Sequence, residues 1–166
     1  MPEHDLVVVV NATPLIALSL VGRLDLLHAL YGRIVIPPAV RQEVLDGKAR
    51  APGVEEVGSA DWIMTRPLQC PAQARLIPDL DLGETEVLAL ALELNADLVI
   101  MDERLGRRHA RRLGLPMTGT LGVLTKAKRK GLIPVIRPLI AGMQTRGFRL
   151  ADDLIARALA MSGEAP

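Results

Sequence analysis

The residues best suited to chemistry in this sequence are one amide and three carboxylates at the ends or beginnings of predicted elements. Asn11 follows a run of valines, and Asp102 follows the apolar run Leu98–Met101. Glu43 and Glu84 lie on two predicted helices. Open parallel sheets bind ligands at the carboxyl ends of their strands, so we expect these side chains to converge in one cleft. Their oxygens are the ligands that Mg²⁺ or Mn²⁺ prefers.

Each of these residues also has a purely structural interpretation. Asn11 and Asp102 both stand before a predicted helix, where either side chain is a good N-cap. Asp81 and Glu84 have the spacing of a capping box. Glu43 lies on an amphipathic helix and fits its solvated face. Residue type and spacing therefore leave both interpretations open.

The elements that must position these residues alternate between strands and helices. Strands are predicted at 6–10, 33–36, 98–101 and 115–117, with an edge strand at 62–64, and helices at 11–22, 23–30, 38–45, 83–94, 103–113, 118–130, 135–145 and 150–161. The remainder of 46–78, rich in glycine and proline, is predicted to form loops. This alternation predicts an α/β fold in which crossover helices cover a mostly parallel sheet. We expect a single domain over 1–166, with a helical extension at about 135–161.

Composition narrows the class of protein. The chain has 166 residues, 49% of them hydrophobic, which is enough for one domain with its own core. With 23% charged residues and a net charge of +1, disorder is not expected. The single cysteine, Cys70, excludes a disulfide scaffold and favours a reducing, cytoplasmic compartment. Aromatic residues make up only 2%, which argues against a protein that stacks bases on several rings.

No membrane span is expected. The longest uncharged run, Leu6–Gly22, contains Asn11, Thr13 and Pro14. It is shorter than the about 20 apolar residues that cross a bilayer. A buried strand followed by a helix explains this run.

A basic stretch follows Asp102. It comprises Arg104, Arg107, Arg108, Arg111, Arg112, Lys126, Lys128, Arg129 and Lys130. Because the whole chain is nearly neutral, this is a local surface, and such surfaces attract phosphate backbones. Two solvated helix faces are the simpler alternative. His109, inside the same helix, fits a surface position better than the role of a general base.

Several short segments, taken in order, resemble a PIN domain, and more closely small PIN-like proteins of bacteria and archaea. They are Val8–Leu18, Gly22–Leu27, Val35–Val40 with Glu43 and Val44, Asp81–Glu86, Leu98–Arg104 and Thr118–Leu124, spanning Val8 to about Ile133. The resemblance implies a three-layer α/β/α sandwich. It also implies a metal-dependent endoribonuclease, in many cases the toxin of a toxin–antitoxin pair. RNA and a cognate antitoxin are the partners that this function implies.

The resemblance also assigns roles to individual residues. Asn11, Glu43, Glu84 and Asp102 match the catalytic and Mg²⁺- or Mn²⁺-binding positions. Thr13 matches a hydroxyl residue of the first loop, and Thr120 follows a strand at the same edge. Together with Arg104, Arg107 and Arg108, these two threonines are the expected RNA-binding residues.

The departure from the family pattern is Asn11, where most PIN nucleases carry Asp. An amide keeps an oxygen ligand but removes one negative charge, which weakens metal binding. The alternative function is therefore a catalytically degenerate PIN-like module that binds nucleic acid or a partner protein. A nucleotide-binding or receiver-like domain ranks below both, since the chain lacks a glycine-rich phosphate loop.

A homodimer is the expected assembly. The predicted C-terminal helix carries an apolar face of Leu150, Leu154, Ile155, Ala158, Leu159 and Met161. The helix before it is also apolar for the end of a chain. PIN-like proteins commonly pair, so part of this surface is expected to contact a second copy.

Overall fold

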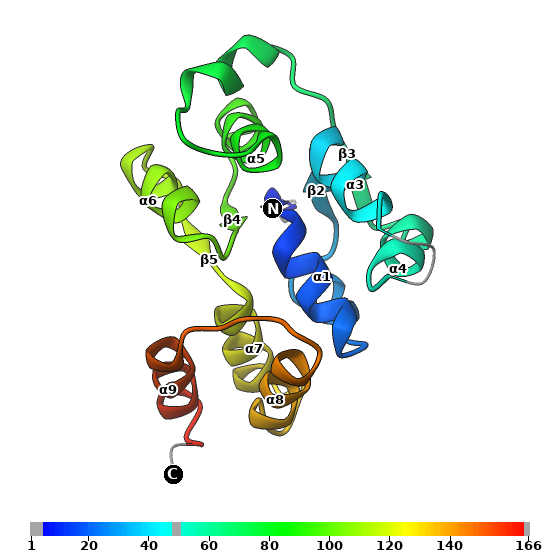
Figure 1. Ribbon diagram of the computed structural model, residues 1–166, viewed down its shortest axis with the longest axis vertical. Helices are drawn as coiled ribbons and strands as arrows, with labels where there is room; N and C mark the ends of the chain where they lie inside the picture. Colours follow the sequence, from blue (N-terminus) through cyan, green and yellow to red (C-terminus); the bar gives the residue numbers. More distant parts are fainter. Residues whose placement is uncertain (1–4, 48–50, 165–166) are drawn as a thin grey trace.

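A five-stranded, all-parallel sheet forms the centre of the molecule, with helices packed around it (Figure 1). The computed structural model describes residues 5–47 and 51–164. The strands are β1 (Val8–Val10), β2 (Ile34–Ile36), β3 (Ile63–Thr65), β4 (Leu98–Ile100) and β5 (Met117–Thr118). Their order in the sheet is β3-β2-β1-β4-β5. The predicted α/β/α sandwich is confirmed.

The helices connect these strands in the predicted sequence. They are α1 (Ala12–Leu20), α2 (Asp25–Tyr31), α3 (Pro38–Leu45), α4 (Val54–Ser59), α5 (Leu82–Glu93), α6 (Arg104–Arg112), α7 (Thr120–Arg129), α8 (Arg137–Thr145) and α9 (Asp152–Met161), with a 3₁₀ helix, η1 (Pro71–Leu76). The loop prediction for 46–78 is wrong at α4 and η1, while 48–50 lie outside the described residues. The helix α4 forms because Glu56 accepts a hydrogen bond from the Gly53 backbone N–H at 3.0 Å and Val57 is fully buried.

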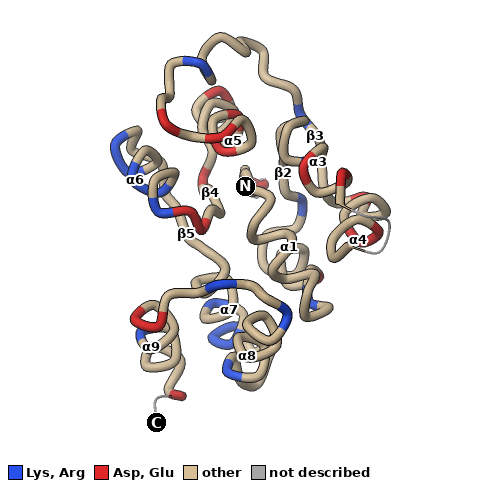
Figure 2. Tube along the Cα trace, viewed as in Figure 1, with Lys and Arg blue, Asp and Glu red and all other residues tan. Residues whose placement is uncertain are grey.

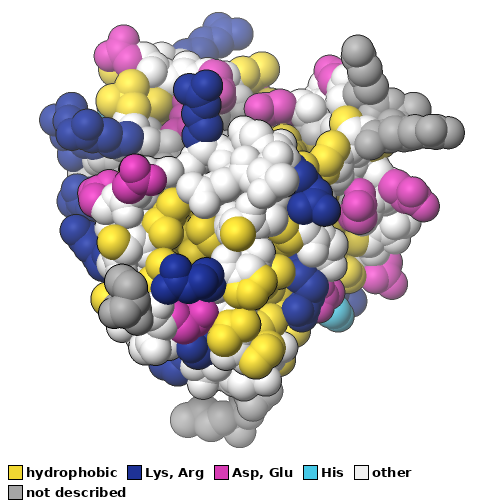
Figure 3. All heavy atoms as spheres, turned by 60° about the horizontal axis from the view of Figure 1, so that its bottom comes forward, with side chains coloured by type: hydrophobic (Ala, Val, Ile, Leu, Met, Phe, Trp, Pro, Cys, Tyr) yellow, Lys and Arg dark blue, Asp and Glu magenta, His cyan; other side chains and the backbone are white. Residues whose placement is uncertain are grey.

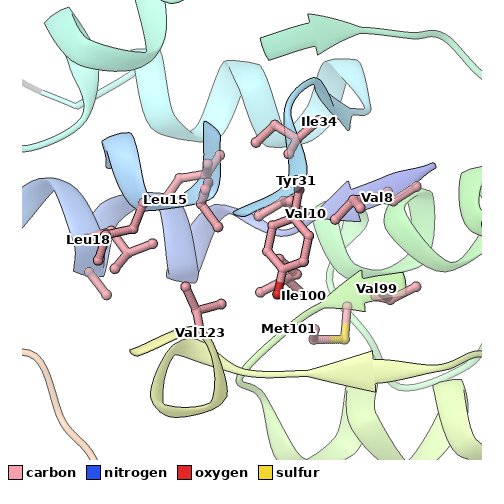
Figure 4. Packing of buried hydrophobic residues seen from close by; sticks show 14 of the residues in the cluster. Val8, Val10, Leu15, Leu18, Tyr31, Ile34, Val99, Ile100, Met101 and Val123 are labelled. Atoms are coloured by element: carbon pink, nitrogen blue, oxygen red, sulfur yellow. The ribbon is translucent and has the colours of Figure 1, made fainter. Parts of the chain in front are cut away.

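The middle strand explains the run of valines in the sequence. All three residues of β1 are fully buried, as expected for a parallel strand covered on both faces. Val9 pairs with Val35 on one side and with Val99 on the other. Side chains of α1 and α2, including Leu15, Leu18 and Tyr31, pack with those of β1 and β4 in the same core (Figure 4).

The sheet reverses its direction of growth beside β1. The chain adds β2 and then β3 on one side, and α5 then leads to β4 on the other side. The Asn11 backbone N–H donates to the Ile100 carbonyl at 2.9 Å, so the ends of β1 and β4 stay joined. Such a reversal point is where open α/β sheets bind their ligands.

The last two helices close the end of the molecule away from this site (Figure 1). The helix α9 packs on α7, and α8 packs on α1. The Glu164 carboxylate accepts hydrogen bonds from the Ile136 and Arg137 backbone N–H groups and from Lys128 Nζ. This carboxylate ties the chain end to the start of α8.

No single helix in the described part of the chain is long and apolar enough to cross a membrane. Taken together, α1 and α2 have the length and composition of a membrane span, but the two helices are bent by 119° at their junction. Leu15, Leu18, Leu26 and Leu27 on this pair are fully buried core residues.

Candidate functional site

Asn11 occupies the N-cap position of α1 but does not act as a cap. Its backbone is extended, and its side chain makes no capping hydrogen bond. Instead, Asn11 Nδ2 donates to Glu103 Oε2 at 3.0 Å. Asn11 is only 2% exposed, and its Oδ1 has no hydrogen-bond partner among the described residues. A buried acceptor without a partner is costly, so this oxygen suits contact with a bound cation or water.

The unpaired oxygen of Asn11 is one of three oxygen atoms that lie close to Gly83. A methyl group built on Gly83 would lie 3.0 Å from Glu43 Oε2, 3.5 Å from Asp81 Oδ1 and 3.7 Å from Asn11 Oδ1. Three oxygens from β1, α3 and the start of α5 therefore converge around a residue with no side chain. The N-terminus of α5, which favours negative charge, lies at the same point.

Glu84 forms the capping box that its spacing with Asp81 predicts. The Asp81 backbone N–H donates to Glu84 Oε2 at 3.0 Å, and the Glu84 backbone N–H donates to Asp81 Oδ1 at 2.8 Å. Burial raises the pKa of Glu84, and the charges of Asp81, Glu103 and Glu43 raise it further, against the hydrogen bond from Asp81. Glu84 therefore caps the start of α5 and also interacts electrostatically with Asp81, Glu103 and Glu43.

Asp102 does not cap the helix that follows it. The cap position of α6 belongs to Glu103, which makes no capping hydrogen bond with its side chain. Asp102 instead accepts from the Thr120 backbone N–H at 2.8 Å and from Thr120 Oγ1 at 2.6 Å, at the start of α7. Burial raises the pKa of Asp102, although both hydrogen bonds from Thr120 oppose that change.

Glu43 is the most exposed of the four predicted residues, yet its carboxylate oxygen reaches the space beside Gly83. Desolvation of the carboxylate raises its pKa, and the charges of Asp81 and Glu103 raise it further. This pattern separates Glu43 from an isolated, solvated surface glutamate.

Glu103 belongs to this site and was missed by the sequence reasoning. Its Oε2 accepts from Asn11, and its Oε1 accepts from the Thr13 hydroxyl. Its charge raises the pKa of Glu43, Glu84 and Asp102 alike. The available signal was its position directly after Asp102 at the end of a strand.

The predicted RNA-binding residues fall into two groups. Arg104 and Arg108 are exposed on α6, whereas Arg107 is half-buried and donates through Nη1 to the Met101 carbonyl at 3.3 Å. Figure 2 shows this basic helix beside the acidic ends of β4 and α5. Thr120 is fully buried against Asp102, and the hydroxyl of Thr13 is held by Glu103. Both threonines therefore support the acidic residues, and neither presents a free hydroxyl to solvent.

The chemistry of the donor atoms at this site suits a hard divalent cation. The donor set consists of carboxylate and amide oxygens, without a sulfur or imidazole ligand. Within 5–47 and 51–164, no three His, Cys, Asp or Glu side chains are already grouped closely enough to hold a metal ion. The convergence at Gly83 contains two carboxylates and depends on the Asn11 amide for its third oxygen.

The parallel sheet, its reversal point beside β1 and the oxygen ligands gathered there define an α/β protein with an acidic site at the carboxyl edge of its strands. The family model of DUF3368, described as a PIN domain, matches residues 7–164, and the chain belongs to this family. PIN domains are a nuclease family whose members generally depend on divalent metals. No curated protein matches the chain.

Proposed function

We propose that this protein is a Mg²⁺- or Mn²⁺-dependent endoribonuclease that hydrolyses RNA phosphodiester bonds. The observation that carries the proposal is the convergence of Asn11 Oδ1 with Glu43 and Asp81 oxygens around Gly83, at the reversal point of the sheet. Crowded carboxylates repel one another. Burial raises the pKa values of Glu43 and Glu84, and the charges of neighbouring carboxylates raise them further.

Asn11, Glu43, Glu84 and Asp102 are the proposed metal-holding residues. A bound divalent cation supplies an activated water and stabilises the charge that develops on the phosphate. Among the residues themselves, Glu43 and Asn11 contribute oxygens at Gly83. Asp102 is fixed by Thr120, so its carboxylate is pre-oriented beside β4.

The helix α6 is the proposed contact for the RNA backbone. It begins directly after Asp102 and Glu103, and Arg104 and Arg108 are exposed on it. Basic side chains attract phosphates without regard to sequence. A phosphate held here would lie beside the acidic residues.

A cleavage assay tests the proposal. Labelled single-stranded RNA should be cut in Mn²⁺ or Mg²⁺, and EDTA should abolish the cutting. Glu43→Gln should remove the activity while leaving the fold intact, because the Glu43 side chain makes no hydrogen bond with the described residues and the residue is exposed. Glu55→Gln, an exposed glutamate on α4, is the matched control. Cutting that survives in Glu43→Gln would contradict the proposed site.

We further propose that the enzyme is the toxin of a toxin–antitoxin pair in the cytoplasm. The basis is membership of the PIN family. Expression should arrest growth, and co-expression of the product of a neighbouring small gene should relieve the arrest. Growth arrest that persists in Glu43→Gln would show that the toxicity has another cause.

A specific observation favours one alternative, a PIN module that binds RNA or a partner without cutting it. Residue 11 is an amide, so the site carries one negative charge fewer than an aspartate would give it. RNA binding that is unaffected by EDTA, together with no cleavage in Mn²⁺, would support this alternative.

A further inference from the structure

The orientation of the Asn11 amide is decided by Glu103. A carboxylate only accepts hydrogen bonds, so the group of Asn11 that faces Glu103 Oε2 at 3.0 Å must be the NH₂. The opposite atom, Oδ1, is thereby turned toward Glu43 and Asp81 at Gly83.

Glu103 is itself held in place from a second direction. Its other oxygen, Oε1, accepts from the Thr13 hydroxyl. Asn11 is the N-cap residue of α1 and Thr13 lies in its first turn, directly after β1, whereas Glu103 follows β4. The carboxylate therefore joins the two strand ends that flank the reversal point of the sheet.

The charges around Glu103 add a second reason to place it in the site. Its charge raises the pKa of Glu43 in α3, of Glu84 in α5 and of its chain neighbour Asp102, which follows β4. Residue 11 carries no negative charge, but Glu103, which accepts a hydrogen bond from it, does. A charge beside a neutral ligand oxygen still attracts a cation in a partly dry site.

We propose that Glu103 is a positioning residue that aims the Asn11 oxygen at a divalent cation and supplies the negative charge that residue 11 lacks. This inference rests on the proposed function. It treats the pair Asn11 and Glu103 as a unit that replaces a single aspartate after β1. Residues that orient metal ligands typically change metal affinity by about 10- to 100-fold when they are lost.

Substitution can reverse the direction of the hydrogen bond between residues 11 and 103. In Glu103→Gln the side-chain amide can donate to Asn11 Oδ1, which turns the oxygen away from Gly83. An aspartate at position 11 has two equivalent acceptors and needs no such orientation. The double variant Asn11→Asp/Glu103→Gln should therefore regain what Glu103→Gln loses, since the Gln amide then donates to the new carboxylate.

Mn²⁺ titration followed by electron paramagnetic resonance tests the inference, with the melting temperature in EDTA measured in parallel. Glu103→Gln should raise the Kd for Mn²⁺ at least about tenfold. The double variant should return the Kd to the parent value or below it. Loss of folding alone would lower the melting temperature and would not be rescued by an aspartate at position 11.

The other outcomes distinguish failure of the positioning role of Glu103 from failure of the metal site. If Glu43→Gln weakens Mn²⁺ binding and Glu103→Gln does not, Glu103 has no positioning role and the metal site stands. If Glu103→Gln weakens binding and the double variant fails to restore it, the orientation mechanism is wrong. If the parent chain does not bind Mn²⁺, or Glu43→Gln leaves its Kd unchanged, the proposed function itself fails and the inference falls with it.

Discussion

The chemistry of this site depends on an amide where an acid would be expected, and on what surrounds that amide. Asn11 is buried, donates through its NH₂ group to Glu103 and leaves its oxygen unpaired beside Glu43 and Asp81. An aspartate of the same shape would instead face the Glu103 carboxylate with a second negative charge. The residue at position 11 therefore determines both how strongly the site repels Glu103 and how strongly it attracts a metal ion.

Asn11→Asp should make stability depend on metal. In EDTA the new carboxylate loses the donor to Glu103 and repels it, which should cost about 1 kcal/mol and lower Tm by about 2–4 °C. In Mn²⁺ the added charge should tighten metal binding and raise RNA cleavage. Thermal denaturation with and without Mn²⁺ measures both effects. A variant with the stability and metal response of the parent would place residue 11 outside the acidic site.

Gly83→Ala should weaken metal binding without weakening the fold. The new methyl would lie 3.0 Å from Glu43 Oε2 and would fill the space where the oxygens converge. Alanine is favoured over glycine in helices by up to about 1 kcal/mol, so Tm in EDTA should stay equal or rise. The Kd for Mn²⁺ should rise roughly tenfold, as for other disturbed ligand shells. An unchanged Kd would show that a cation does not use this space.

At the scale of elements, the chain end is held by charge-assisted hydrogen bonds rather than by apolar packing alone. Burial acts to raise the pKa of Glu164, but hydrogen bonds from Ile136, Lys128 and Arg137 outweigh it and lower the pKa. A lowered pKa in the folded state stabilises the fold above the ordinary glutamate pKa of about 4.3, and that stability is lost as the pH falls through the folded-state pKa.

Glu164→Gln should therefore lower Tm at neutral pH, because the amide cannot replace the ionised acceptor of Lys128 and two backbone N–H groups. The difference from the parent should shrink as the pH falls below about 4.3. Calorimetry across this range measures it, with Glu55→Gln as an exposed control. A difference that stays constant with pH would mean that the Glu164 charge does not fasten the chain end.

The helix α6 carries the proposed contacts to RNA, and its charges should be visible in the salt dependence of binding. Arg104→Ala/Arg108→Ala removes two exposed cations. Each phosphate contact with a single strand contributes about 0.7 to the slope of log K against log salt, so the slope should flatten by about 1.4. Filter binding in EDTA measures it. Arg149→Ala/Arg157→Ala, two exposed arginines before and on α9, is the control. Equal slopes for both pairs would remove α6 from the RNA site.

At the scale of the whole molecule, exposed apolar side chains occur on several elements, and those of α9 are candidates for a contact between copies of the chain. Figure 3, turned to bring the end with α7, α8 and α9 forward, shows hydrophobic side chains gathered among basic ones. Leu154 is 45% exposed and Met161 is 70% exposed on α9. A dimer through this end would leave the site beside Gly83 open.

The chain should form a homodimer in solution, with twice the 17.9 kDa chain mass in light scattering at micromolar concentration. Leu154→Glu/Met161→Glu should convert it to a monomer with a Tm close to that of the parent, because both side chains are exposed on α9. The buried residues Ala158 and Leu159, which pack α9 onto the core, stay in place. A parent chain that runs as a monomer would contradict the prediction.

Local pattern determined most of the fold. The run of valines in β1, the alternation of apolar runs with helical periodicity and the Asp81–Glu84 spacing all depend on neighbours within a few residues, and each of these elements formed as predicted. The resemblance to PIN domains rests on the same local segments, and the family match confirms it. The helix in the region 46–78 is harder to predict, because the N-cap residue of α4 is Gly53, with φ of +93°, and a glycine in such a stretch is typical of a loop.

Only the tertiary structure decided what the acidic residues contact. Asn11 meets Glu103 across 92 positions of the chain, and Asp102 meets Thr120 across 18. Gly83 became part of the site because it lacks a side chain where Glu43 and Asp81 approach. Hydrogen bonds between distant residues leave no periodicity in the sequence, since their geometry is set by the pairing of strands and the packing of helices, and these exist only once the chain has folded.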